Sequence, residues 1–396
     1  MASSSNNIEE RMDEYFDQAF DNYFDKEFEN RFNQAFSDQQ EATMEKPKRS
    51  YIERDREDGH RRLWDDYFSD DATYPPRFFR RRFRMNKSLF LRIVERLSAE
   101  VPYFRQRQDA TGRFGLSALQ KSTAAIRMMA YGCAADAVDE YLQLAESTAM
   151  LCLEQFVEGV INLFGDEYLR RPTVEDLQRL LAIGEWRGFP GMIDSIDCMH
   201  WEWKNCPTAW KGQYTRRSGK PTIVLEAVAS QDLSIWHAFF GPPDGIYPNW
   251  VTFIQSIPMP ADPKASLFAT CQEATRKDVE RAFGVLQARF AIVRNPTLFL
   301  NKKKIGKIMR ACIILHNMIV EDERDEATQF DKATFTQADS SRTPEVDLSY
   351  STETPSNVTN LMSNIMSKRK DLRDRKIHQR LKADLVENIW QKFRTN

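Results

Sequence analysis

A helical spacing of apolar residues runs through residues 89–181. Intervals of three and four residues place one set of side chains on a single helical face: Leu116, Leu119, Thr123, Ile126 and Ala130. Gly132 indicates the end of that helix, because glycine readily adopts the left-handed conformation that closes helices. Ser147 is predicted to cap a longer helix whose apolar face carries Phe156, Val160 and Phe164. The pattern therefore predicts a unit made only of helices.

A short helix at residues 136–142, a turn and this longer helix together resemble a helix-turn-helix. No lysine or arginine occurs between Arg127 and Arg170. The same interval contains these acidic residues: Asp136, Asp139, Glu140, Glu146, Glu154, Glu158, Asp166 and Glu167. A helix with this charge repels phosphate, so we favour a structural or partner-binding role over direct reading of DNA.

The period changes to that of strands after Trp186. Residues 192–203, 222–229 and 233–240 are rich in isoleucine, valine and aromatics, with turn residues between them, which predicts an antiparallel meander. Helical spacing returns at residues 265–293 and 302–323, and one face of the first helix carries Val279, Phe283, Leu286 and Phe290. Strands followed by helices indicate an α+β or α/β domain.

The N-terminal 45 residues are acidic and contain phenylalanines four residues apart: Phe16, Phe20, Phe24, Phe28, Phe32 and Phe36. On a helix this stripe winds slowly around the axis, which suits either a solvated helix or one that docks on a partner. Residues 326–360 are rich in serine, threonine, proline and aspartate, a composition typical of disorder. Residues 361–393 are expected to form an exposed helix with a basic patch.

The densest basic cluster spans residues 77–84 and interleaves five arginines with phenylalanines: Arg77, Arg80, Arg81, Arg82 and Arg84. Arginines beside aromatics suit phosphate contacts and base stacking, so this cluster is a candidate DNA-binding surface. An amphipathic helix with buried phenylalanines and solvated arginines has the same pattern. The run is also typical of a nuclear import sequence.

Composition narrows the function classes. The chain of 396 residues has a net charge of -2, so a uniformly basic coat for nucleic acid is excluded and phosphate binding requires local clusters. Mean hydropathy is -0.59, and no run approaches the roughly 18 apolar residues of a membrane-spanning helix. The polar N-terminus lacks the apolar core of a secretory signal, and six scattered cysteines suit a reducing compartment. We therefore expect no membrane partner.

Three acids are candidates for chemistry. Asp197 lies inside a predicted strand, Asp244 opens a turn, and Glu280 lies on a predicted helix beside Arg276, Lys277 and Arg281. Carboxylates on two strands and a crossing helix can bind two Mg²⁺ or Mn²⁺ ions, which prefer oxygen ligands and promote cleavage of phosphodiesters. The neighbouring basic side chains would then contact the nucleic-acid backbone. Spacing alone leaves open that the acids are turn or cap residues.

Two other groups are weaker candidates. Cys198, His200 and Cys206 suggest zinc ligands, but no fourth ligand is evident and a strand explains them as packing residues. His316 lies on an apolar helical stretch, which is typical of a hydrogen-bonded core histidine.

Four sequence blocks carry a family resemblance. They are residues 191–207 around Asp197, residues 244–248, residues 280–290 and residues 315–319. Together they resemble plant proteins of the PIF/Harbinger transposase superfamily, and the resemblance extends over residues 47–325. It implies an RNase H-like fold with a DDE triad of Asp197, Asp244 and Glu280 that binds Mg²⁺ or Mn²⁺. It also implies a nuclear, DNA-directed protein and a separate Myb-like DNA-binding partner protein.

One interval departs from the family pattern. Thirty-five residues separate Asp244 from Glu280, as in the family, but only 46 separate Asp197 from Asp244. Family members have a long insertion after the position of Gly241, including the strand that carries the second aspartate. Here only Pro242 and Pro243 remain, and prolines remove the amide donors that a central strand requires. We therefore expect an RNase H-like domain without its fourth-strand region, and impaired cleavage.

The expected organisation has six segments: an acidic aromatic segment (1–45), a basic arm (46–85), a helical helix-turn-helix-like unit (86–182), an RNase H-like DDE domain (183–323), a disordered linker (324–360) and a C-terminal helix (361–396). Two functions share this architecture. The first is a metal-dependent DNA endonuclease by ancestry, with impaired activity. The second is an inactive nuclear factor that binds DNA or protein.

Overall fold

The computed structural model describes residues 54–203, 206–215, 219–241, 253–294, 302–335 and 375–394. The phenylalanine stripe of the N-terminal segment, Asp244 and residues 336–360 lie outside these ranges. The described chain is a mixed α+β protein in which helices predominate around one small antiparallel sheet. Of the two expected fold classes, the structure therefore has α+β. Among the described residues, no helix is long and apolar enough to cross a membrane.

The first three helices enclose an aromatic cluster. Helix α2 (Arg56–Tyr67) is capped by Asp55, α3 (Pro76–Phe83) begins at a proline, and α4 (Lys87–Glu100) follows. Phe79 and Phe83 of α3 are buried and stacked, with ring centroids 4.1 Å apart. Two of the three phenylalanines of the basic cluster, Phe79 and Phe83, therefore belong to the core, as the amphipathic interpretation predicts.

Helix α5 (Ala118–Tyr131) has the boundaries that its sequence predicts. Ser117 and Gln120 form a reciprocal capping box at its start, and Gly132 closes it in the left-handed conformation with φ of 61°. The short helix appears as η1 (Ala135–Val138) and α6 (Asp139–Leu142). The long helix α7 (Glu146–Tyr168) begins before Ser147, so the prediction that Ser147 caps it is wrong. Gln143 adopts a left-handed conformation and turns the chain directly into α7.

The helices do not confirm a helix-turn-helix. Helix α7 packs against α4, α5 and α11 (Lys302–Phe335), so its sides are covered by other helices. Lysines of α11 pair with two of its acidic side chains, Lys304 with Glu154 at 3.1 Å and Lys307 with Glu158 at 2.5 Å. The acidic charge predicted for this helix is therefore partly neutralised by a segment distant in the sequence.

The predicted meander is confirmed. After α8 (Val174–Trp186), strands β1 (Ser195–Glu202), β2 (Thr222–Ala229) and β3 (Ile235–Gly241) pair antiparallel in the order β1-β2-β3. The connection between β1 and β2 contains η2 (Thr208–Trp210) and α9 (Lys211–Tyr214). Within the described ranges no strand pairs with the other edge of β1. The helix-turn-helix and RNase H-like identities of the two predicted units stay predictions.

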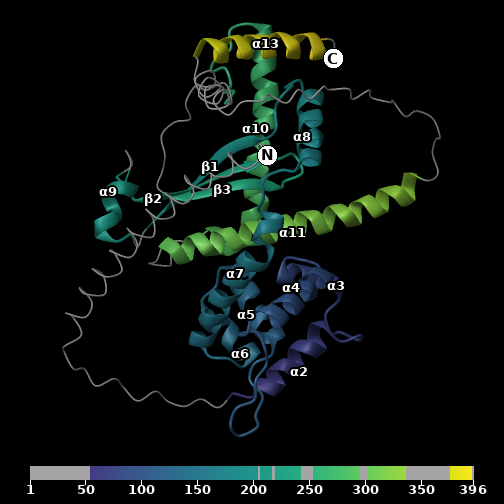
Figure 1. Ribbon diagram of the computed structural model, residues 1–396, viewed down its shortest axis with the longest axis vertical. Helices are drawn as coiled ribbons and strands as arrows, with labels where there is room; N and C mark the ends of the chain where they lie inside the picture. The colour runs from purple at the N-terminus through teal and green to yellow at the C-terminus, as the bar shows by residue number, and fades with distance from the viewer. Residues whose placement is uncertain are drawn as a thin grey trace, which may run out of the picture. The chain divides into compact units, whose positions relative to one another are not determined.

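Two long helices flank the sheet (Figure 1). Helix α10 (Pro263–Arg289) packs on β1 and β2, and its predicted apolar face is buried. After η3 (Ala291–Arg294), α11 lies between the sheet and α7 (Figure 1), and it extends to Phe335, into the segment predicted to be disordered.

The C-terminal helix α13 (Arg375–Phe393) packs on α10, so the prediction of an exposed helix is wrong. Its Leu385 and Ile389 are buried against Phe268 and Phe189. The apolar residues of α13 have a covered face because a segment more than 100 residues earlier in the sequence supplies the partner.

The described residues from Arg54 onward belong to one compact unit, and a single core cluster contains side chains from both predicted domains, such as Phe156 and Trp203. The predicted boundaries at residues 85 and 182 stay predictions.

Two side chains of α11 join the helices to the sheet. His316 is fully buried, and its Nε2 lies 2.8 Å from the carbonyl oxygen of Leu233. Burial and the nearby Arg289 lower the pKa of His316 to about 4, so the ring is neutral at physiological pH. Asn317 hydrogen-bonds the backbone of both α7 and β3. His316 is therefore a hydrogen-bonded core histidine, as predicted.

Candidate functional site

A buried hydrogen bond fixes β1 on α10. The hydroxyl of Ser195, the first residue of β1, donates to the carbonyl oxygen of Thr275 at 2.9 Å. Two residues later on β1, Asp197 faces the next turn of α10, where Arg276 and Glu280 lie. Strand and helix thus bring together two of the three predicted acids, while Asp244 lies outside the described residues.

One guanidinium joins these two acids. Nη1 of Arg276 lies 2.8 Å from Oδ2 of Asp197 and 2.7 Å from Oε1 of Glu280. Its Nη2 donates to Glu273 at 2.8 Å. The hydrogen bond with Glu273 is the strongest contribution to a pKa of Arg276 above its ordinary value, followed by the charge of Glu280. Three carboxylates therefore surround one permanent cation.

This arrangement does not fit the expected metal. A divalent ion needs the oxygens that Asp197 and Glu280 direct at Arg276, and the guanidinium lies between them. Among the described residues no three His, Cys, Asp or Glu side chains are arranged to hold a metal ion, and this includes Cys198, His200 and Cys206. With Arg276 in this position, Asp197 and Glu280 form ion pairs instead of a metal site.

A surface hollow of about 520 Å³ lies beside the three carboxylates. Its lining comes from α10, from the turn between β2 and β3 and from the end of α8, and it consists of Arg187, Gln231, Thr270, Glu273, Ala274, Lys277, Asp278 and Arg281. Lys277 is exposed, whereas Arg187 and Arg281 both pair with the buried Asp278. Three cations against two acids leave the rim positive, which suits an anionic group.

A neighbouring carboxyl, that of Asp194, is only partly compensated, by the charge of Arg179. Its Oδ1 is buried and has no hydrogen-bond partner. Burial, with the charges of Asp232 and Asp278, raises the pKa of Asp194 to about 8. Asp194 is therefore mostly protonated at neutral pH, in the segment directly before β1.

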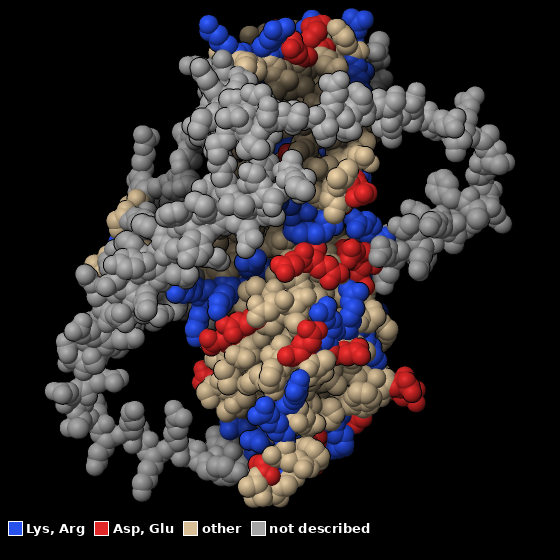
Figure 2. Space-filling model, in the orientation of Figure 1, with Lys and Arg blue, Asp and Glu red and all other residues tan. Residues whose placement is uncertain are grey.

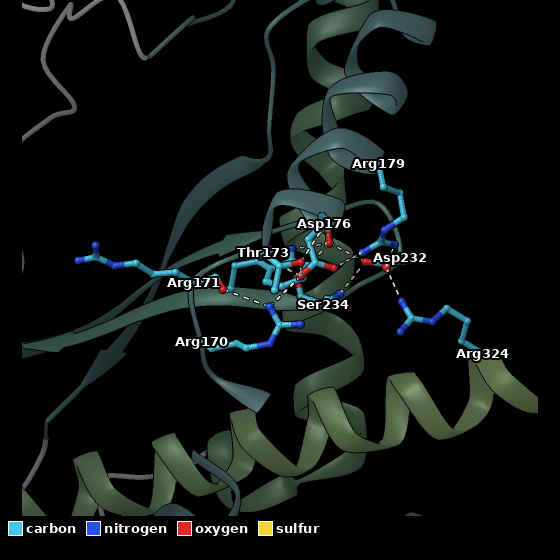
Figure 3. Close-up of polar contacts among 10 residues, drawn as sticks. Arg170, Arg171, Thr173, Asp176, Arg179, Asp232, Ser234 and Arg324 are labelled. Atoms are coloured by element: carbon cyan, nitrogen blue, oxygen red, sulfur yellow. Dashed lines mark hydrogen bonds and ion pairs between the residues drawn. The ribbon is translucent and has the colours of Figure 1, made fainter. Parts of the chain in front are cut away.

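Asp232, in the turn between β2 and β3, has several charged and polar partners, and its pKa is lowered where that of Asp194 is raised (Figure 3). Its Oδ2 accepts from Arg179 of α8 at 2.7 Å and pairs with Arg324 of α11 at 3.0 Å. Burial alone would raise its pKa, but hydrogen bonds from Ser230 and Arg179 lower the pKa of Asp232 to about 2. The turn beside the hollow is thus held by two helices.

The arginines of α3 divide into two groups. Arg82 lies over the ring of Tyr74, 4.1 Å from its centroid, and Arg84 lies over Tyr131 at 5.5 Å. Arg80 pairs with Glu323 of α11 at 2.6 Å. Arg77 and Arg81 are exposed. Arg77 also lies over a ring, that of Phe78, at 5.1 Å. Four of the five predicted DNA contacts therefore have structural partners, which the sequence pattern did not reveal.

Charges of both signs are interspersed on the surface. On the face drawn in Figure 2, lysine and arginine side chains lie beside aspartate and glutamate side chains. Any contact with phosphate on this face therefore involves short groups of basic residues.

Sequence reasoning missed Glu273, Arg187 and Asp278. The spacing of Glu273, Arg276 and Glu280, three and four residues apart on a helix, was visible in the sequence. Arg187 and Asp278 lie 91 residues apart, and only the packing of α8 beside α10 brings them together.

Comparison with known proteins finds a family match over the residues that form this site. A family model described as "Plant transposon protein" matches residues 166–244 and 242–327, which include β1, α10 and most of α11. A domain of unknown function matches residues 59–98. No curated protein matches the chain. No solved structure matches it either. Over residues 166–327 the chain is therefore similar to plant transposon proteins.

Proposed function

We propose that this chain is a nuclear protein derived from a DDE transposase, and that it binds DNA while its cleavage activity is impaired. The observation that carries the proposal is the juxtaposition of Asp197 and Glu280 around Arg276. The first and third acids of the proposed triad are adjacent, as DDE ancestry requires, but they are engaged by a cation of the protein itself.

The family match supports the ancestry and the altered site. Its two segments meet at residues 242–244, where the sequence has only Pro242 and Pro243 before Asp244. A deletion of family sequence at this point would divide a match in this way. A second aspartate without its own strand would lack the rigid support that metal-dependent cleavage needs.

The rim of the hollow supports contact with DNA. Lys277 is exposed there, next to Arg281 and within one helical turn of Glu280. Arg77 and Arg81 on α3 are the second candidate surface. Contacts of these side chains with phosphates would give affinity without sequence preference and with strong salt dependence.

We expect Lys277→Gln to weaken binding to a short DNA duplex and to flatten the plot of log K against log salt by about 0.9, the value for one lost phosphate contact. The variant Arg77→Gln/Arg81→Gln tests α3 and should reduce the slope by up to about twice as much. Fluorescence anisotropy in EDTA over a series of salt concentrations measures both effects.

The matched control is Lys220→Gln, which removes the same charge from a residue that lies two positions before β2 and pairs with Glu202. It should leave the slope unchanged. Equal slopes for all variants and the wild type would show that neither surface contacts DNA.

The chain is expected to show no nicking of supercoiled DNA in Mn²⁺ that depends on Asp197. The assay compares the wild type with Asp197→Ala. The alternative function, a working metal-dependent endonuclease, predicts nicking by the wild type and its loss in Asp197→Ala. That result would refute impaired cleavage.

The family resemblance adds a Myb-like DNA-binding protein as a proposed partner. Asp136, Glu140 and Glu146 are exposed around α6 and the start of α7, and such a surface repels phosphate. Sequence-specific DNA recognition would then come from the partner, and the chain itself would supply contacts to the DNA backbone.

A further inference from the structure

We infer that Arg276 is a built-in counter-ion that competes with divalent cations for Asp197, Glu273 and Glu280, so that its removal creates a cation site. The inference rests on the proposed function only in expecting Mg²⁺ or Mn²⁺ as the competing ion. It explains why acids that resemble a DDE set are not arranged as a metal site in the described chain.

The guanidinium is held from two elements. Glu273 and Glu280 lie three residues before and four residues after Arg276 on α10, and Asp197 approaches from β1. Glu273 contacts both Nε, at 3.2 Å, and Nη2, at 2.8 Å. This pairing fixes the plane of the guanidinium and directs Nη1 at the other two acids. A metal ion must therefore displace a side chain with several simultaneous contacts.

The charges favour a cation at this position. The three carboxylates and Arg276 taken alone carry two more negative than positive charges, and the exposed Lys277 at the next position of α10 offsets part of this excess at Glu273. The side chains of Asp197, Glu273 and Glu280 are 29%, 42% and 44% exposed, so a hydrated ion can reach them from solvent. Without Arg276, three unpaired carboxylates would face one small volume, and their mutual repulsion would be relieved by a divalent ion.

Arginine makes this competition independent of ordinary pH changes. A guanidinium stays protonated throughout the physiological range, and the surrounding acids raise the pKa of Arg276 further. The guanidinium of Arg276 is therefore displaced from the carboxylates only by another cation that binds them, or by an anion such as a phosphate that attracts the guanidinium away.

Titration of the full chain with Mn²⁺, without DNA, tests the inference. Isothermal titration calorimetry and the loss of the free Mn²⁺ signal in electron paramagnetic resonance report the affinity. We expect Arg276→Gln to bind Mn²⁺ at least about tenfold more tightly than the wild type, which corresponds to about 1.4 kcal/mol. Arg276→Lys keeps the charge but not the planar set of donors, and its affinity should lie between the two.

Two controls separate this site from a general change in charge. Lys277→Gln removes a positive charge at the next position of α10 and should change Mn²⁺ affinity by less than Arg276→Gln. Adding Asp197→Asn to Arg276→Gln should abolish the gain. Circular dichroism verifies that each variant is folded. If Arg276→Gln is unfolded, the Mn²⁺ affinity of Arg276→Lys is compared with that of the wild type, and an unchanged affinity would then overturn the inference.

Unchanged Mn²⁺ affinity in folded Arg276→Gln would overturn the inference, and so would a gain that persists with Asp197→Asn. DNA takes no part in this titration. Absence of DNA binding would therefore refute the proposed function alone, whereas unchanged metal affinity would refute this inference alone.

Discussion

Replacing Asn317 by alanine is expected to lower the free energy of unfolding by about 3 to 5 kcal/mol, because three buried hydrogen bonds to backbone groups are lost together. The amide of this buried side chain donates to the carbonyl oxygens of Tyr168 at 2.6 Å and of Ile235 at 2.7 Å. Its Oδ1 accepts from the amide of Ile235 at 2.9 Å. One side chain thus joins α11, the end of α7 and the first residue of β3. Denaturant unfolding followed by circular dichroism measures the loss.

The control for this prediction is Asn388→Ala on α13, which removes one hydrogen bond of 3.0 Å to the carbonyl oxygen of Gly188. Its effect should be within about 1.5 kcal/mol, the usual net contribution of a single bond. A similar small effect for both variants would show that water replaces the contacts of Asn317.

Asp194→Asn is expected to stabilise the protein at pH 8, and its advantage over the wild type should decrease as the pH is lowered. Burial raises the pKa of Asp194 from 3.8 to about 8 in the folded state. The unfolded chain releases this proton from about pH 4 upward and the folded chain only near pH 8, so the wild type loses stability between these values. The slope is up to about 1.4 kcal/mol per pH unit.

Thermal melting of both proteins at several pH values from 5 to 8.5 measures the difference, and taking the difference removes the effect of other titrating groups such as His316. Asp232→Asn is the contrasting variant. Because hydrogen bonds lower the pKa of Asp232 to about 2, its charge stabilises the folded state at neutral pH, and the replacement should destabilise the protein there. A pH-independent difference for Asp194→Asn would contradict a protonated Asp194.

Local patterns in the sequence determined most of the elements. Helix α5 was predictable because its apolar period and its closing residue Gly132 act over a few neighbours. The three strands were predictable because each is a short β-branched and aromatic run bounded by turn residues. Asp197 and Glu280 could be selected from their motifs, and the register of β1 on β2 and its contact with α10 place them together.

Contacts between distant segments decided the rest, because their free energy depends on residues that the local pattern does not contain. The pattern at residues 77–84 suits both a solvated arginine cluster and a core helix, and burial of Phe79 and Phe83 decided between them. Helix α13 was expected to be exposed because the local sequence does not show what covers its apolar face. The residue that covers it, Phe268, lies on α10, more than 100 residues earlier.

The state of the candidate site also depends on tertiary structure. The sequence by itself supplied the acids and, in the spacing of Glu273, Arg276 and Glu280, the ion pairs along α10. Only the packing of β1 on α10 adds Asp197 to the same guanidinium. An arginine beside three carboxylates attracts all three at short range and offsets part of their charge, whereas the same residues in an extended chain are separated and solvated. The sequence therefore determined which charges the protein has, and the fold decided which of them are paired.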